Sequence, residues 1–199
     1  MLNLEMLALN FHESLNLKPL FSHMDRQIAA STGPEKVLYV ARLDQIAKEI
    51  TSRQMVILEQ NGQKFSKTVD FEAFKASPGG LELEPQILTL GGVEREFRLS
   101  VTKIIPERKE LQMELQVRAP GDSSSGQKVK FHVGYYDFPM IDNTRLSKDQ
   151  RAAVVMNEFL PDAAADLTLV LFPGSYSSLK ERVSIDEVVE KLRVLNQQD

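Results

Sequence analysis

One short segment, residues 134–145, holds the densest group of side chains that could bind or transform a small molecule. It reads Gly-Tyr-Tyr-Asp-Phe-Pro-Met-Ile-Asp-Asn-Thr-Arg. Its two carboxylates, Asp137 and Asp142, could act as a general acid and base, or could hold a hard cation through oxygen ligands. The aromatic rings could stack on a ligand, and a guanidinium could bind a carboxylate or phosphate. The candidate ligand-binding residues are therefore Tyr135, Tyr136, Asp137, Asp142, Asn143 and Arg145.

The same segment also fits an ordinary structured turn. In that interpretation Asp142 and Asn143 bond to local backbone groups, as Asp and Asn commonly do in turns. Phe138 and Met140 would fill the core, and Arg145 would pair with an aspartate. Because turn chemistry accounts for most of these residue types, the sequence assigns no catalytic residue.

Other motifs fail at their defining positions. Residues 172–180, Phe-Pro-Gly-Ser-Tyr-Ser-Ser-Leu-Lys, resemble a phosphate-binding loop only in outline, since a single Gly is present and no hydroxyl residue follows the Lys. They also lack the Gly-x-Ser-x-Gly turn of serine hydrolases. The histidines, His12, His23 and His132, form no zinc-binding pair of the His-Glu-x-x-His type. We therefore predict no metal site and no cofactor.

Composition excludes several classes of protein. The chain has 199 residues, with 24 basic and 28 acidic side chains and a net charge of −4. That balance argues against a global nucleic-acid-binding surface, which needs a basic excess. The absence of Cys excludes disulfides, thiolate nucleophiles, iron–sulfur clusters and cysteine-based zinc sites.

The sequence predicts a soluble, cytoplasmic protein. The first residues have no basic region, and Glu5 interrupts the apolar run, so a secretory signal is not expected. The longest apolar run, residues 167–172, is only as long as a strand. A membrane-spanning helix requires roughly 18 or more apolar residues.

The first 50 residues are expected to be helical. Leu4, Leu7 and Phe11 recur at helical spacing, although Leu2, Leu4 and Met6 also alternate as in a strand. Pro19 could open a second helix, and residues 32–35, Thr-Gly-Pro-Glu, could open a third that reaches Ile50.

The middle of the chain changes to the two-residue period of strands. Asn61-Gly62 predicts a tight hairpin turn between strands at 55–59 and 64–71. Further strands are expected at 81–90, 96–105, 110–118 and 128–136, and alternation of apolar and polar residues indicates antiparallel pairing with one wet face. Pro85 should make the 81–90 strand an edge or break it.

The last part is expected to contain a helix, a strand and a second helix. Residues 147–150, Ser-Lys-Asp-Gln, resemble a capping box that opens a helix to about residue 160. A buried strand at 166–172 and a helix from Ser184 would follow.

This order of elements favours an α+β fold over a parallel α/β sheet. We expect N-terminal helices, a central antiparallel sheet (a sandwich or a partly open barrel) and a C-terminal helix–strand–helix. The expected parts are a helical segment at 1–50, a β region at 51–140 and a mixed segment at 141–199 that packs with the β region as one domain.

Three functions remain open at this stage. The first is a non-catalytic interaction module, such as an adaptor, an accessory subunit or an inhibitor, that binds another protein subunit through Leu4, Leu7 and Phe11. The second is a small-ligand-binding or sensing domain that uses the 135–145 loop, which requires that loop to face a cavity. The third is a hydrolase or transferase that uses Asp137 and Asp142, which requires a raised pKa at one of them. Nucleic-acid binding is not expected, and the sequence leaves the oligomeric state open.

Overall fold

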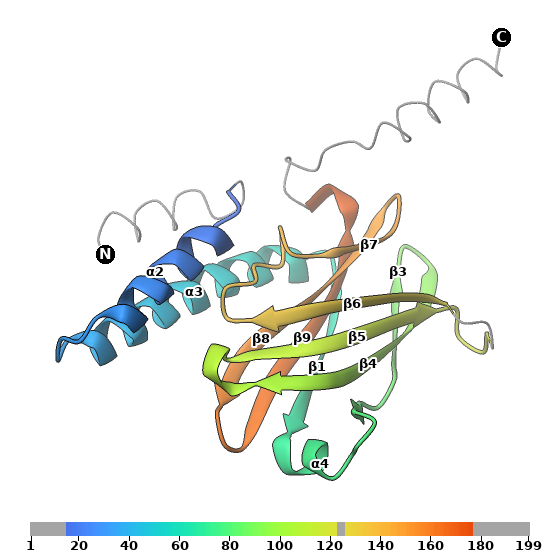
Figure 1. The fold of residues 1–199 in the computed structure, drawn as a ribbon. Coiled ribbons are helices and arrows are strands. Elements are labelled where there is room, and N and C mark those ends of the chain that lie inside the picture. The colour runs from blue at the N-terminus through green and yellow to red at the C-terminus, as the bar shows by residue number, and fades with distance from the viewer. Residues whose placement is uncertain (1–14, 123–125, 177–199) are drawn as a thin grey trace, which may run out of the picture.

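A pair of helices precedes the β-structure in the computed structural model, which describes residues 15–122 and 126–176 (Figure 1). They are α2 (Lys18–Ala30) and α3 (Lys36–Glu59). Pro19 lies in the first turn of α2, and α3 begins directly after residues 32–35, as predicted. The helical spacing expected at Leu4, Leu7 and Phe11 and the helix expected from Ser184 lie outside the described residues.

Four strands form the first antiparallel sheet, which we call sheet A. Its order is β1 (Gln63–Asp70), β9 (Ala164–Pro173), β8 (Gln150–Leu160) and β7 (Thr144–Ser147). The short helix α4 (Phe71–Lys75) follows β1, and the carboxylate of Asp70 caps it by accepting the backbone N–H groups of Glu72 and Ala73.

The second antiparallel sheet, sheet B, follows the order β2 (Leu81–Glu82), β4 (Val93–Ile105), β5 (Glu110–Arg118) and β6 (Gln127–Gly134). In addition, β3 (Gln86–Leu90) pairs with β4. The short 3₁₀ turns η1 (Pro106–Arg108) and η2 (Gly174–Tyr176) follow β4 and β9.

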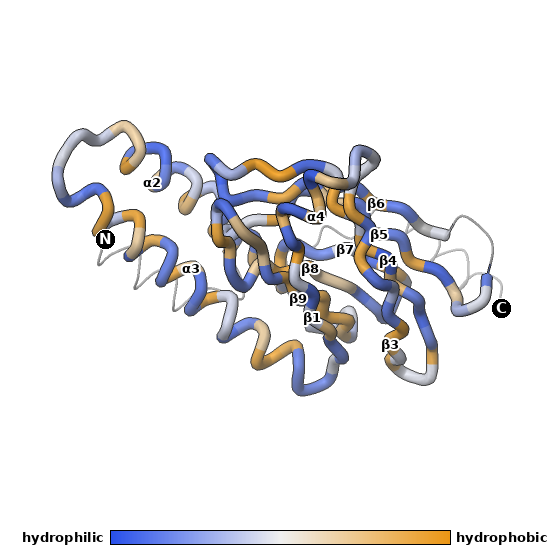
Figure 2. Tube along the Cα trace, turned by 90° about the horizontal axis from the view of Figure 1, so that it is seen from below, coloured by the Kyte–Doolittle hydropathy of each residue, from blue (hydrophilic) through white to orange (hydrophobic). Residues whose placement is uncertain are grey.

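The two sheets share one apolar core and together form an open sandwich. Along β5 every second residue, Leu111, Met113, Leu115 and Val117, is buried in that core. Leu167, Leu169 and Leu171 of β9 contribute from sheet A. Figure 2 shows hydrophobic and hydrophilic residues alternating along the strands, while α2 and α3 lie side by side and project beyond the sheets. The mixed helix-and-strand fold with antiparallel sheets is therefore confirmed.

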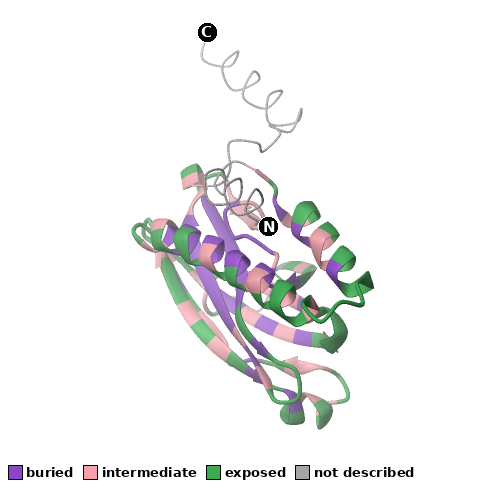
Figure 3. Ribbon diagram, turned by 90° about the vertical axis from the view of Figure 1, so that its left-hand side faces the viewer, coloured by how far each residue is buried: buried purple, intermediate pink, exposed green. Residues whose placement is uncertain are grey.

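Helix α3 covers the other face of sheet A. Its buried Met55 and Leu58 belong to a cluster with apolar side chains of β8 and β9, namely Ala153, Val155, Val170 and Phe172. Figure 3 shows this helix lying across the buried strands. Strands β8 and β9 are thus buried on both faces.

The helix predicted from residues 147–150 to residue 160 is wrong, because this segment is the β7–β8 hairpin. Ser147 pairs with Gln150 across a turn made by Lys148 and Asp149, so the apparent capping box is a hairpin turn. Residues Ala152–Met156 are apolar without interruption because both faces of β8 are covered. Such a run carries no two-residue period that would distinguish a strand from a helix.

The strand predicted at 55–59 and the Asn61-Gly62 hairpin are also wrong, because α3 continues to Glu59. Asn61-Gly62 instead connects α3 to β1. Gly62 is needed there for close approach, since a Cβ atom would lie 2.5 Å from the Leu171 carbonyl oxygen and 2.6 Å from that of Leu58. The Asn-Gly pair therefore marks a tight connection, but not a hairpin.

The other predicted strands are found close to their expected bounds. Strand β5 spans Glu110–Arg118, and β4, β6 and β9 differ from the prediction by a few residues at their ends. Pro85 interrupts the expected 81–90 strand and separates β2 from β3, as predicted. Within residues 15–122 and 126–176 we find no helix with the length and apolar character of a membrane span.

Gln54 of α3 provides a test of how the helix is fixed to the rest of the fold. Its side chain is 0% exposed, and its Oε1 atom accepts the backbone N–H of Met140 at 3.1 Å. Gln54→Leu should lower the free energy of unfolding by about 1–3 kcal/mol, because the buried N–H of Met140 loses its acceptor. Urea denaturation measures the change. Gln45→Leu, at an exposed position on the same helix, is the control, and an equal loss in both variants would contradict this role of Gln54.

Candidate functional site

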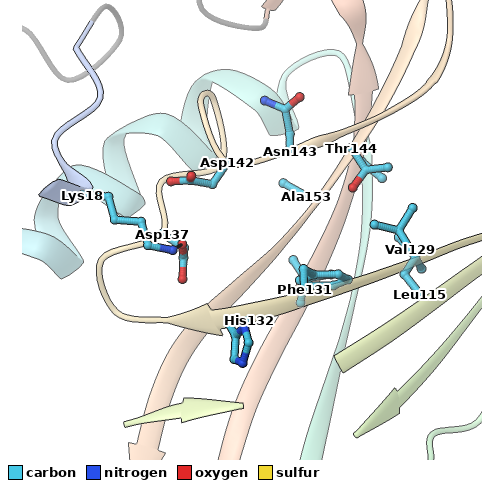
Figure 4. Close-up of a pocket in the computed structure, with 12 residues that line it drawn as sticks. Lys18, Leu115, Val129, Phe131, His132, Asp137, Asp142, Asn143, Thr144 and Ala153 are labelled. Atoms are coloured by element: carbon cyan, nitrogen blue, oxygen red, sulfur yellow. Dashed lines mark hydrogen bonds and ion pairs between the residues drawn. The ribbon is translucent and has the colours of Figure 1, made fainter. Parts of the chain in front are cut away.

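A cleft of about 410 Å³ lies where the two sheets end side by side, at β6 of sheet B and at β7 and β8 of sheet A (Figure 4). Its apolar wall consists of Leu115, Val129, Phe131, Ala152, Ala153 and Val154. Its polar lining consists of Lys18, His132, Asp137, Asp142, Asn143 and Thr144. Val129 and Phe131 are only half-buried, because no further strand of the described residues covers β6 on this side. The sandwich therefore leaves apolar surface open at this seam.

Asp137 fixes one end of the cleft. Its Oδ2 atom accepts the backbone N–H of Gly134 at 2.8 Å, at the point where β6 ends. Its Oδ1 atom pairs with the ammonium group of Lys18 at the start of α2. Burial alone would lower the pKa of Lys18, but the hydrogen bond and negative charge of Asp137 outweigh it and raise that pKa. This carboxylate thus holds the end of β6 and the start of α2 together.

Asp142 lies at the same end of the cleft but in a different environment. Its Oδ2 atom accepts the backbone N–H of Phe138 at 2.9 Å. Burial raises the pKa of Asp142, and the nearby charge of Asp137 raises it further, while the Phe138 N–H and Lys18 oppose that change. The raised pKa is the property that the hydrolase or transferase hypothesis requires of one carboxyl group.

The two candidate tyrosines have structural contacts and do not belong to the described residues that line the cleft. Tyr135 lies in the sandwich core, where its hydroxyl oxygen accepts the backbone N–H of Phe159 at 2.7 Å. The Tyr136 hydroxyl donates to Asp44 of α3 at 3.2 Å and lies 3.4 Å from Asp25 of α2. Burial and these two carboxylates raise the pKa of Tyr136. The Tyr136 ring also packs on Phe21, which ties the helix pair to the loop.

The remaining two candidates differ in position. Asn143 lines the cleft, donates to the Pro139 carbonyl at 3.1 Å and accepts from Arg151 at 2.8 Å. Arg145 lies in β7, where its Nε donates to the Ser147 carbonyl at 3.3 Å, and it is absent from the cleft lining among the described residues. The structure therefore gathers Asp137, Asp142 and Asn143 at the cleft and places Tyr135, Tyr136 and Arg145 elsewhere.

These contacts also fit the expectation of a structured turn. Phe138 and Met140 are buried, and Asp142 and Asn143 bond to local backbone groups. Polar side chains of the 135–143 loop thus form hydrogen bonds that hold the loop in place. The predicted partner-binding residues Leu4, Leu7 and Phe11 lie outside the described residues.

Sequence reasoning missed several of the residues that line the cleft. Lys18 was missed because the chain reversal that brings α2 to the loop has no local signal. Val129 and Phe131 stand out only as the apolar face of an alternating strand, and their exposure depends on β6 being the last described strand of its sheet. In the described part of the chain, no group of His, Cys, Asp and Glu side chains is placed to hold a metal ion.

Comparisons of this chain with models of protein families, with curated proteins and with solved structures found no match.

The raised pKa of Asp142 gives a pH-dependent prediction for Asp142→Asn. A carboxyl group whose pKa is raised by folding favours the folded state most below its unfolded-state pKa, and this contribution is lost as pH rises through the folded-state pKa. The amide removes the charge but keeps an oxygen that can accept the Phe138 N–H. The free energy of unfolding of the variant, relative to the wild type, should therefore increase between pH 3 and pH 7.

Urea denaturation across that pH range measures the difference. Asp162→Asn, at an exposed position in the β8–β9 turn, is the matched control for introducing an amide. A difference between Asp142→Asn and wild type that stays constant with pH would show that burial does not control this carboxyl group.

Proposed function

We propose that the protein is a non-catalytic binding module, and that the cleft beside β6 receives an apolar group of a partner molecule. The observation that supports this proposal is the cleft itself, which combines half-buried Val129 and Phe131 with a polar rim. Its volume of about 410 Å³ is within the range of binding pockets, roughly 300–1,000 Å³. Covering its wall would remove apolar surface from water, which stabilises a complex by about 25 cal/mol per Å² before the costs of association.

The polar rim supports binding of an apolar group more than binding of a charged one. Lys18 and Asp137 neutralise each other, and Asp142 is engaged by the Phe138 N–H. A charged ligand would have to compete with these contacts, whereas an apolar group needs only the exposed wall. This favours a side chain of a protein partner, as expected of an adaptor or accessory subunit, over a small charged metabolite.

A second candidate function is a hydrolase or transferase, and the raised pKa of Asp142 beside Asp137 favours it. General acid–base catalysis needs two carboxyl groups that can exchange protons with a substrate. Asp137, however, is only 8% exposed, and its carboxylate is held by both the Gly134 N–H and the Lys18 ammonium group. Because one of the two groups is committed to these contacts, we place this function second.

Titration with 1-hexanol, followed by NMR, tests whether the cleft accepts an apolar group. We expect saturable shifts of backbone amides in β5, β6 and β8, centred on Val129 and Phe131. Val129→Phe should weaken this binding at least tenfold, because the larger ring occupies the cleft. Val56→Phe is the matched control, since Val56 is 62% exposed on α3, away from the lining. Shifts spread over the surface, or equal binding by both variants, would contradict the proposal.

A further inference from the structure

Within the part of the chain that the structure describes, strand β6 has a free edge directly beside the cleft. Among the described residues it pairs only with β5, and it ends sheet B. The β5–β6 register is continuous from Glu110–Gly134 to Val117–Gln127, without a bulge. A long, regular edge strand offers unpaired backbone N–H and C=O groups to another chain, which is the basis of strand addition.

The hydrogen bonds of Gly134 show which backbone groups face that edge. Its N–H donates to Asp137, and its carbonyl accepts from the Asp137 N–H at 3.3 Å, so both groups point away from β5. In an antiparallel pair this orientation repeats at every second residue. The N–H and C=O groups of Lys128, Lys130 and His132 therefore also point to the open edge.

A contact on the far side of β5 supports this assignment. Gln112 lies opposite His132 in the register, and its carbonyl accepts the Thr102 hydroxyl of β4 at 3.1 Å. The Gln112 carbonyl therefore points to β4 and away from β6, as required if His132 directs its own backbone groups outward.

The side chains of the same strand divide by face. Lys128, Lys130 and His132 are exposed, with the Lys128 and Lys130 side chains 52% and 71% exposed, and His132 also belongs to the cleft lining. Val129 and Phe131 lie on the inner face and line the cleft, and Figure 4 shows Phe131 and His132 leaving β6 on opposite sides. The Glu114 carboxylate forms ion pairs with both ammonium groups, at 3.0 Å from that of Lys128 and 3.7 Å from that of Lys130. The side chains of β6 are thus basic on the outer face of the sheet and apolar on the inner face.

From this arrangement we propose that β6 binds an extended peptide segment of a partner protein as an added antiparallel strand, with alternating apolar and acidic residues. Residues opposite Val129 and Phe131 would place apolar side chains in the cleft. Residues opposite Lys128 and Lys130 would place carboxylates next to ammonium groups on the outer face, where opposite charges on paired strands stabilise the pair. This proposal rests on the proposed binding function and specifies the chemistry of the partner segment.

Asp137 defines where the added strand ends. Its Oδ2 atom occupies the position at the Gly134 N–H that the carbonyl group of a neighbouring strand would take. The open edge therefore runs from Lys128 to His132. The paired Lys18 neutralises this carboxylate, so the acidic peptide does not meet an uncompensated negative charge at that end.

The first test uses fluorescence anisotropy to measure how tightly the full chain binds a capped seven-residue peptide that alternates valine and glutamate. A peptide with lysine in place of glutamate should bind at least tenfold more weakly. In the proposed register the glutamate N–H groups face β6 and the valine N–H groups face away. N-methylation of the glutamates should therefore abolish binding, whereas N-methylation of the valines should preserve most of it.

The second test changes the edge of the protein. Lys130→Pro removes an N–H that points outward, and proline is tolerated on edge strands at such positions. Lys130→Ala removes the same charge but keeps the N–H, so it is the matched control. We expect the proline variant to bind the valine–glutamate peptide at least tenfold more weakly than the alanine variant, with thermal unfolding confirming that both are folded.

The outcomes separate this inference from the proposed function. Equal effects of the two N-methylation patterns, or equal binding by Lys130→Pro and Lys130→Ala, would overturn strand addition. If 1-hexanol binds the cleft but no peptide binds, the cleft functions as proposed and the lysines instead protect the edge from pairing. If neither probe binds, both proposals fail.

Discussion

Much of this structure depends on the burial of β8 and β9 on both faces. Their inner side chains fill the core shared with sheet B, and their outer side chains pack against α3. Each fully buried aliphatic or aromatic side chain contributes about 1.5–3 kcal/mol relative to an exposed one. Sheet A therefore requires both a second sheet and a covering helix. This requirement places α3, and with it the α2–α3 pair, beside the cleft.

The loop between β6 and β7 is held by contacts with α2, α3, β8 and the end of β6. Tyr135 reaches β8, Tyr136 reaches the helix pair, and Gln54 of α3 binds the backbone of Met140. Asp137 adds the link from β6 to α2. These polar groups hydrogen-bond to one another and to the loop backbone, and such contacts stabilise the loop. A segment rich in potentially catalytic side chains thus serves largely to position the end of β6.

Beside this loop the two sheets leave an incomplete seam. On one side of the seam are the backbone groups of β6, and beneath them lies an apolar wall that the core does not fill. Both features have the same cause, because the described strands include none that follows β6 in sheet B. A partner that supplies a strand would satisfy the backbone groups and cover the wall at once, so the two contributions to binding would be coupled through one peptide geometry.

The sequence by itself determined the strands whose two faces differ, such as β5 and β6, because alternation of apolar and polar residues records which face is wet. It also determined the break at Pro85, the proline at the start of α2 and the absence of any cysteine chemistry. It did not determine β8, because a segment covered on both faces shows an unbroken apolar run whose period is not readable. It also did not determine the length of α3, because the apolar run at residues 55–58 is too short to distinguish a strand from a helix, although Val56 is exposed in the helix. Only the tertiary structure decided that Asp137 and Asp142 lie beside Lys18, since this proximity depends on α2 packing next to the loop. It also decided that β6 is an edge strand among the described residues, because strand order depends on pairing between distant residues and leaves no trace in the spacing along the chain.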